Sequence, residues 1–419
     1  MTLVADAPKQ GFRLGMLIYD TRYRSITIQI IVLILVLLLV GWLVDNTREN
    51  LANKGKDIDF GFLWRRAGYD IGQHLIPYTN DSFHIRAAAV GLINTLVVAA
   101  LACVLSTMLG VILGVLRLSK NWIVSRLVGV YVEIFRNIPL LLWIILVGTI
   151  FAEIMPSPRD FKPVDGVAKA EMSLWDSVAI TNRSTNVPMP QLDRPLPAIE
   201  TPFLTLNTSF LAIVALIGAS IWVNRRLLKR AKAVQEATGV RPVTWWQSIL
   251  LLAGPLLAAL LLMGFHLEYP VLKGFNFQGG ISFDHAFTAL TLSLTLYYAA
   301  ITSEIVRSGI QAISRGQSEA AFALGLRPGR TMSLVILPQA LRVIIPPMIS
   351  QWLSLTKDTS LGIAVSYLDL RGTLGGITLN QTGRELECML LLMMTYLIIS
   401  LIISAFGNLY NSSVKLKER

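Results

Sequence analysis

Two short motifs place an acid and a base inside long apolar stretches, where ionisable side chains are costly and usually functional. Both have the pattern E-I-x-R, with Glu133 and Arg136 in the first and Glu304 and Arg307 in the second. Residues three apart lie on one face of a helix, so each acid can pair with its base. The motifs could contact a charged solute. Alternatively, they lie at the cytoplasmic interface, with the arginines reaching toward the headgroups.

A third charged group, Lys357-Asp358-Thr359, lies in the middle of an apolar stretch, residues 344–365, that also contains two adjacent prolines. We expect it to interrupt a helix there, and interrupted helices expose helix ends that bind small charged solutes. Lys357 and Asp358 could then complement a carboxylate and an ammonium group of a solute. The alternative is an ion pair that holds two helices together, between Lys357 and Asp358 or with Glu304 or Arg136. Asn137 and Thr359 could add hydrogen bonds in either case.

The elements that must position these groups are membrane-spanning helices. Of the 419 residues, 53% are hydrophobic and 15% charged, against about 25% charged in soluble domains. The apolar residues form runs of roughly the 20 residues that cross a bilayer. The predicted fold is therefore all-α and polytopic, with about eight transmembrane helices. These cover residues 26–44, 87–116, 127–154, 208–223, 246–265, 286–305, 337–368 and 388–409.

The orientation of the spans follows from the basic residues of the short loops, which are enriched on the cytoplasmic side. Residues 224–241 contain six Lys or Arg and one acid. This loop should be cytoplasmic, and both termini with it. Lys9, Arg13, Arg22 and Arg24 near the start and the tail 414–419 agree. The net charge of +11 is gathered in such loops, which indicates membrane topology rather than nucleic-acid binding. Residues 155–207 should form an irregular excursion on the outer side.

One cytoplasmic segment, residues 315–342, is too patterned for a simple linker. Ser318 is a plausible helix N-cap, and Glu319 suits the positive end of the helix dipole. The following alanines give a helix with little side-chain bulk, and Gly325 is placed to end it. A turn at residues 327–329 and a second helix from about residue 332 to Pro338 should complete a hairpin. Exposed Leu324 and Leu326 would suit a groove of another protein; the alternative is an ordinary connecting loop.

The spacing of this segment resembles the EAA loop of ABC importer permeases. It reads Glu-Ala-Ala at 319–321, then Gly325, nine further residues and Val-Ile-Leu-Pro at 335–338, with valine where isoleucine is usual. The resemblance implies that the loop docks on a cytoplasmic ATPase subunit and transmits its closure to the spans. Residues 91–96, 131–142, 303–310 and 355–361 resemble the polar amino-acid branch of the family. The implied coupling residues are Glu319, Ala320, Ala321, Gly325, Leu337 and Pro338.

The resemblance also implies an architecture in which spans two, three, six, seven and eight form a five-helix permease core. The enlarged form resembles the permeases of general L-amino acid importers and of their glutamate, glutamine, aspartate and asparagine relatives. The expected parts are an N-terminal anchor and outer segment, two halves of the core separated by an insert, and a cytoplasmic tail. Their boundaries are 1–86, 87–154, 155–285, 286–409 and 410–419.

The partners implied are cytoplasmic ATPase subunits, a second related permease and a periplasmic amino-acid-binding protein, at a bacterial inner membrane. No G-x-x-x-x-G-K-[ST] loop occurs, so ATP must be hydrolysed by another chain, and we expect no cofactor on this one. No HExxH or GxSxG occurs either, and the two cysteines lack metal-ligand spacing. We therefore expect neither an enzyme nor a metal site.

For an importer permease, the charged groups become candidates for the substrate pathway. A competing hypothesis is a self-contained secondary carrier coupled to an ion gradient, with Glu133, Glu304 and Asp358 as its proton-coupled acids. A receptor or scaffold would need no charges at membrane depth. The candidate pathway residues are Glu133, Arg136, Asn137, Glu304, Arg307, Lys357, Asp358 and Thr359.

Overall fold

The computed structural model describes residue 18, residues 21–53, residue 55 and residues 58–163, 167–200 and 205–414. The basic residues Lys9 and Arg13 and the tail from Lys415 onward lie outside these ranges. The chain divides into two units, Met1–Gly61 and Phe62–Arg419.

The first unit is dominated by one helix, α2 (Thr21–Asn53), of 33 residues. At 1.5 Å per residue such a helix is about 50 Å long, which exceeds the roughly 30 Å hydrocarbon core of a bilayer. Its charge-free stretch, residues 26–44, is the predicted first span. The predicted anchor helix is therefore present, and it is longer than its apolar part.

The second unit contains the other helices that can cross a membrane. The described residues hold seven such helices in total, or up to eight spans if one bent pair counts as a span. This agrees with the eight predicted. In the second unit they are α3 (His84–Arg117), the pair α4 (Trp122–Asn137) and α5 (Leu140–Thr149), α7 (Thr208–Thr238), α8 (Trp245–Leu262), α9 (His285–Gln311), the segment Pro328–Val365, and α15 (Glu385–Val414).

The third predicted span, residues 127–154, is not one continuous helix. α4 and α5 meet at a bend of 101°, and α5 continues as a π-helical segment, η2 (Ile150–Ile154). The break lies at Ile138, which is extended with φ −101° and ψ 132°, and Pro139. Proline has no N–H to donate, and it disfavours helical geometry in the residue before it. The third predicted span is therefore bent at this proline.

The seventh span is a succession of helical types. It comprises α11 (Pro328–Thr331), the π-helical η4 (Met332–Ile336), α12 (Leu337–Asp358) and the 3₁₀-helical η5 (Thr359–Val365). The wide turn of η4, where the Leu337 N–H bonds the Met332 carbonyl, directly precedes Pro338, which cannot donate. The α-helix ends at Asp358, where the sequence predicted an interruption.

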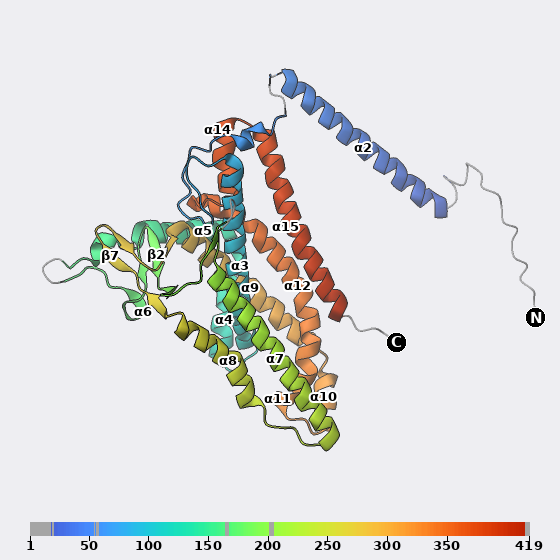
Figure 1. Ribbon diagram of the computed structural model, residues 1–419. Helices are drawn as coiled ribbons and strands as arrows, with labels where there is room; N and C mark the ends of the chain where they lie inside the picture. The colour runs from blue at the N-terminus through green and yellow to red at the C-terminus, as the bar shows by residue number, and fades with distance from the viewer. Residues whose placement is uncertain are drawn as a thin grey trace, which may run out of the picture. The chain divides into compact units, whose positions relative to one another are not determined.

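The core is built around α9, which contacts α3, α4, α5 and α12 (Figure 1). Val98, Ala102, Leu290, Leu294 and Leu355 are completely buried in its main cluster. Two glycines of α3, Gly110 and Gly114, bring the backbones of α3 and α9 close together, as small residues do between membrane helices. A Cβ at Gly110 would lie 2.3 Å from the Thr302 Cβ. The second unit thus contains a close-packed bundle centred on α9.

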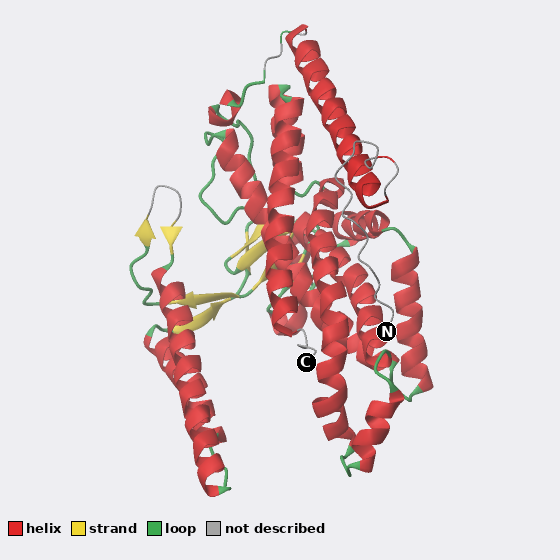
Figure 2. Ribbon diagram, turned by 90° about the vertical axis from the view of Figure 1, so that its right-hand side faces the viewer, coloured by secondary structure: helices red, strands yellow, loops and turns green. Residues whose placement is uncertain are grey.

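Residues 179–206 and 265–284 contain short antiparallel strands, although the sequence predicted an irregular excursion over residues 155–207. In their sheets the strands are ordered β1-β2-β9, β3-β6, β4-β5 and β7-β8. Figure 2 shows strands between the α7–α8 hairpin and the bundle. Strand β9 runs directly into α9, so its pairing with β2 ties the insert to the core. The strands are β1 (Ala179–Ile180), β2 (Ser184–Val187), β3 (Met189–Leu192), β4 (Ile199–Glu200), β5 (Thr205–Leu206), β6 (Phe265–Glu268), β7 (Val271–Lys273), β8 (Asn276–Gln278) and β9 (Ile281–Asp284).

Short helical segments complete the fold. Three of them connect α12 to α15 at the end of the bundle opposite to α10 and α11 (Figure 1). The short segments are η1 (Gly61–Trp64), η3 (Pro158–Phe161), α6 (Ser173–Asp176), α10 (Arg315–Ala323), α13 (Leu370–Gly372), η6 (Thr373–Thr378) and α14 (Leu379–Thr382).

Candidate functional site: a coupling hairpin and a polar seam

The predicted hairpin between α9 and α12 is present. Helix α10 follows the end of α9 by four residues and packs against α11 and η4 at one end of the bundle (Figure 1). Gln339 donates from its Nε2 to the Gln317 Oε1 at 3.2 Å, which ties α12 to α10. The hairpin is therefore connected to both α9 and α12.

Gly325 ends α10 in a left-handed conformation, with φ +75°. Its N–H donates to the Phe322 carbonyl at 2.9 Å, and the Leu326 N–H donates to the Ala321 carbonyl at 3.1 Å. These two bonds form a Schellman motif, which satisfies carbonyls at the helix end. A Cβ at Gly325 would meet nothing within 4 Å. The backbone conformation, and not lack of space, therefore requires glycine.

Two details of the hairpin differ from the prediction. Helix α10 begins at Arg315, with Ser314 as N-cap, and Ser318 lies inside the helix. The Gln317 N–H already bonds the Ser314 carbonyl at 3.1 Å, so the first turn closes before Ser318. Leu326 is half-buried rather than exposed, because the hydrogen bond from its N–H to the Ala321 carbonyl turns the chain back toward α10.

The hairpin nevertheless presents an apolar tip. Leu324 is 81% exposed and Phe322 52% exposed, whereas Ala321 is buried. Large apolar side chains exposed beside each other often mark a protein contact. The other five coupling candidates, Glu319, Ala320, Gly325, Leu337 and Pro338, are all on the surface.

The second E-I-x-R motif forms an ion cluster at the same end of the bundle. The Glu304 Oε1 lies 2.5 Å from the Arg307 Nη2, and Arg117 of α3 donates to the Glu304 Oε2. Arg307 also donates to the Gln311 Oε1 at 2.7 Å. Glu304 therefore joins α3 to α9. Sequence reasoning missed Arg117, although a lone basic residue in the last turn of a span indicated it.

The first E-I-x-R motif is arranged differently. Glu133, Arg136 and Asn137 are exposed, and Asn137 donates to the Glu133 Oε2 at 3.3 Å. Within the described ranges, no ion pair joins Glu133 to Arg136. The two motifs do not form equivalent structures, because α4 breaks immediately after Asn137 whereas α9 continues past Arg307.

The third charged group lies where α12 tightens into η5. Asp358 accepts a hydrogen bond from the Tyr298 hydroxyl of α9 at 2.7 Å. Thr359 is buried, and its hydroxyl donates to the Thr356 carbonyl at 2.9 Å. Lys357 is exposed, and among the described residues it has no ion-pair partner. The alternative ion pairs with Asp358, Glu304 or Arg136 were therefore wrong, since a tyrosine supplies the contact between helices.

Gln351 extends this contact into a polar seam between α9 and α12. Its Nε2 donates to the Tyr298 carbonyl at 2.8 Å and to the Thr302 Oγ1 at 2.6 Å. A buried amide must find such partners. Tyr298 and Gln351 were not among the residues predicted for the site. The amide within an apolar stretch was the available signal.

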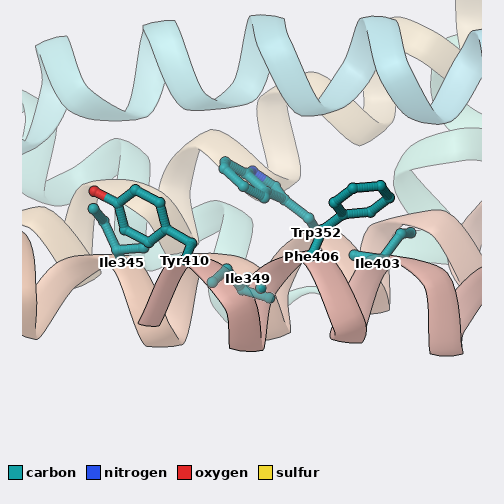
Figure 3. Close-up of a pocket in the computed structure, with 7 residues that line it drawn as sticks. Ile345, Ile349, Trp352, Ile403, Phe406 and Tyr410 are labelled. Atoms are coloured by element: carbon teal, nitrogen blue, oxygen red, sulfur yellow. The ribbon is translucent and has the colours of Figure 1, made fainter. Parts of the chain in front are cut away.

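Two hollows lie on the surface of the second unit. One, about 230 Å³ in volume, is partly polar and joins α5, the start of α9 and the end of η5; it includes Glu153, His285 and Ser366. The other, about 460 Å³, lies between α12 and α15 and is apolar (Figure 3). The indole N–H of Trp352, at this groove, donates to the Thr107 Oγ1 of α3 at 3.1 Å. Only the first hollow offers charged groups to a polar solute.

The bundle of membrane-crossing helices, with a helical hairpin between α9 and α12, defines a polytopic membrane protein. Residues 240–416 match the family of the binding-protein-dependent transport system inner membrane component. The chain is 62% identical over 426 residues to the glutamate/glutamine/aspartate/asparagine transport system permease protein BztB of Rhodobacter capsulatus, covering 100% of both chains. It is 40% identical over 411 residues to the general L-amino acid transport system permease protein AapQ of Rhizobium johnstonii, covering 98% of this chain and 96% of that protein.

The chain belongs to the permease subunits of amino-acid ABC importers. It is a multi-pass membrane transport subunit and not an enzyme. This membership contradicts the secondary-carrier hypothesis and confirms the resemblance noted in the EAA-like segment.

Proposed function

We propose that this chain forms part of the path for polar L-amino acids, with glutamate, glutamine, aspartate and asparagine as the first substrates to test. The name of the relative that matches the whole chain supports this substrate class. We place the chain in the bacterial inner membrane, with both termini cytoplasmic. The six basic residues in 224–241 support this orientation.

The observation that carries the proposal is the hairpin with its exposed Leu324 and Phe322. Its partner is a cytoplasmic ATPase subunit, which binds this tip in a groove and hydrolyses the ATP. A second related permease completes the pathway, and a periplasmic binding protein delivers the amino acid. In this proposal, the chain itself binds no cofactor.

Transport follows from the position of the hairpin between α9 and α12. Closure of the ATPase subunits displaces α10, and the displacement reaches the Glu304 cluster and the seam at Tyr298 and Asp358. The outer hollow, with Glu153 and His285, receives the solute. Lys357 and Asp358 then complement its carboxylate and ammonium groups, as Glu133, Arg136 and Asn137 do from α4.

The test is uptake of labelled L-glutamate and L-glutamine by cells that carry the complete importer, together with recovery of the ATPase subunit in the membrane fraction. Glu319→Lys and Leu324→Asp should abolish uptake and release the ATPase subunit. Glu385→Lys is the matched control, because it reverses an exposed acid away from the hairpin. Undiminished uptake with Glu319→Lys and Leu324→Asp at normal membrane levels would refute the proposal.

A further inference from the structure

Helix α7 is much longer than its hairpin partner α8, with 31 residues against 18. The first residues of α7 and the last residues of α8 lie at the same level, at the outer end of the hairpin. There, the Ser209 Oγ accepts from the Leu196 N–H at 2.8 Å, and the Arg194 N–H donates to the Met263 carbonyl at 3.1 Å. The difference of 13 residues, 31 minus 18, extends α7 about 20 Å beyond the first residue of α8. Arg225 is thus level with Trp245.

The extended part of α7 has two distinct faces. Asn224, Leu227 and Ala231, at helical spacing, are half-buried or buried. Arg225 and Lys229, one helical turn apart on the other side, are exposed. Arg226 and Lys229 have no acidic partner among the described residues. Further along the helix, the Lys232 Nζ lies 3.7 Å from the Glu236 Oε1. A cationic face is therefore free at the level where α8 begins.

Tryptophans locate this face relative to the bilayer. Trp245 and Trp246, in the first turn of α8, are 68% and 51% exposed. The guanidinium of Arg226 lies 3.6 Å from the ring centroid of Trp222. Tryptophan is enriched at the level of the headgroups, where its ring meets the apolar core. Arg225, Arg226 and Lys229 therefore lie at the depth of the lipid phosphates.

We propose that Trp222, Arg225, Arg226 and Lys229 form a binding face for the phosphate groups of anionic phospholipids, such as phosphatidylglycerol. Clustered Lys and Arg next to a span attract anionic headgroups, and the tryptophans hold the cluster at their depth. Lipid is favoured over an acidic protein because the face continues directly from the apolar, lipid-facing part of α7. The leaflet follows from the proposed orientation, but the binding does not depend on the transport function.

The test is native mass spectrometry of the full-length chain purified in its complex, with equal amounts of phosphatidylglycerol and phosphatidylcholine. Wild type should retain phosphatidylglycerol preferentially. In the triple variant Arg225→Gln, Arg226→Gln, Lys229→Gln, the ratio of bound phosphatidylglycerol to bound phosphatidylcholine should fall about tenfold, because each cation contributes to headgroup attraction. The double variant Arg225→Lys, Arg226→Lys keeps all three charges, since residue 229 is already lysine, and should retain the preference. The control for charge loss at other exposed positions is Lys120→Gln with Arg126→Gln; Lys120 lies between α3 and α4, and Arg126 lies in α4.

Three results would overturn the proposal. Wild type could bind both lipids equally, and this result does not depend on the folding of any variant. The control could lose the preference as strongly as the triple glutamine variant, which would show a general charge effect. The triple glutamine variant could keep the lipid preference but lose the ATPase subunit during purification, which would identify an acidic protein as the partner.

Discussion

Arg117, in the last turn of α3, donates to the carboxylate of Glu304 in α9. Gly110 and Gly114, on preceding turns of α3, lie against Thr302 and against the Ser303 carbonyl of α9. The ion pair therefore follows two close contacts between these helices, and α9 ends a few residues later, just before the hairpin. The Arg117–Glu304 pair links α3 to the end of α9 from which the hairpin begins.

Glu304→Gln should weaken this link. Arg117 and Arg307 would lose a shared anionic partner, and a hydrogen bond to a charged group contributes about 1.5–3 kcal/mol. We expect a lower midpoint of thermal unfolding and reduced uptake. Glu133→Gln is the matched control for the unfolding midpoint, because Glu133 has the same motif but is exposed and bonds only Asn137 among the described residues. Equal shifts of the unfolding midpoint in the two variants would contradict the role given to Glu304.

Tyr298→Phe removes the donor of the hydrogen bond to Asp358, whereas Asp358→Asn removes the negative charge and keeps an oxygen that can accept this bond. If the Asp358 carboxylate also meets the ammonium group of the solute, Asp358→Asn should reduce uptake about tenfold or more, with Tyr298→Phe reducing it much less. Initial uptake rates at several substrate concentrations, with membrane levels matched, make the comparison. Equal losses in both variants would show that Asp358 serves only to hold α9 and α12 together.

Asp369, between η5 and α13, should make the protein less stable as the pH rises. Burial raises the pKa of its carboxyl from 3.8 to about 6, although the Gly372 N–H and the Tyr396 hydroxyl both donate to it. Between these values the native state keeps a proton that the unfolded chain has lost, so stability falls as pH rises through about 6. The change is at most about 3 kcal/mol.

The measurement for Asp369 is the midpoint of thermal unfolding of the purified chain at pH 4.5 and pH 6.5. Asp369→Asn should flatten the dependence over this interval. Asp81→Asn, at an exposed carboxylate paired with Arg66, should leave it unchanged. A wild-type midpoint that rises between the two pH values, with no change in Asp369→Asn, would be the opposite of the expected sign.

Local sequence signals predicted much of the fold and of the hairpin. Apolar runs located the spans because bilayer thickness sets their length. Gly325 marked a helix end because its left-handed conformation is set by neighbouring residues. Contacts between distant segments were not predictable in this way. The pairing of Asp358 with Tyr298, and of Glu304 with Arg117, depends on how α3, α9 and α12 pack, which one sequence does not specify.

The short strands and the break in α4–α5 illustrate two further limits. Strands such as β1 and β4, with two residues each, are too short to show an alternating pattern. Pro139 was visible in the sequence, but prolines occur both in bent and in continuous membrane helices. Pro346 and Pro347 lie inside α12 without ending it, whereas Pro139 coincides with a bend of 101°. Tertiary packing decides between these outcomes.

The most direct test of the central claim compares two glycines of the coupling hairpin, Gly325 and Gly316. Both would have open space around an added Cβ, but only Gly325 has a positive φ. Alanine in that conformation costs about 1–2 kcal/mol. Labelled L-glutamate uptake should fall about fivefold or more with Gly325→Ala and stay near wild type with Gly316→Ala, at equal membrane levels. Equal uptake in Gly325→Ala and wild type would contradict the claim that the shape of this hairpin couples the ATPase to transport.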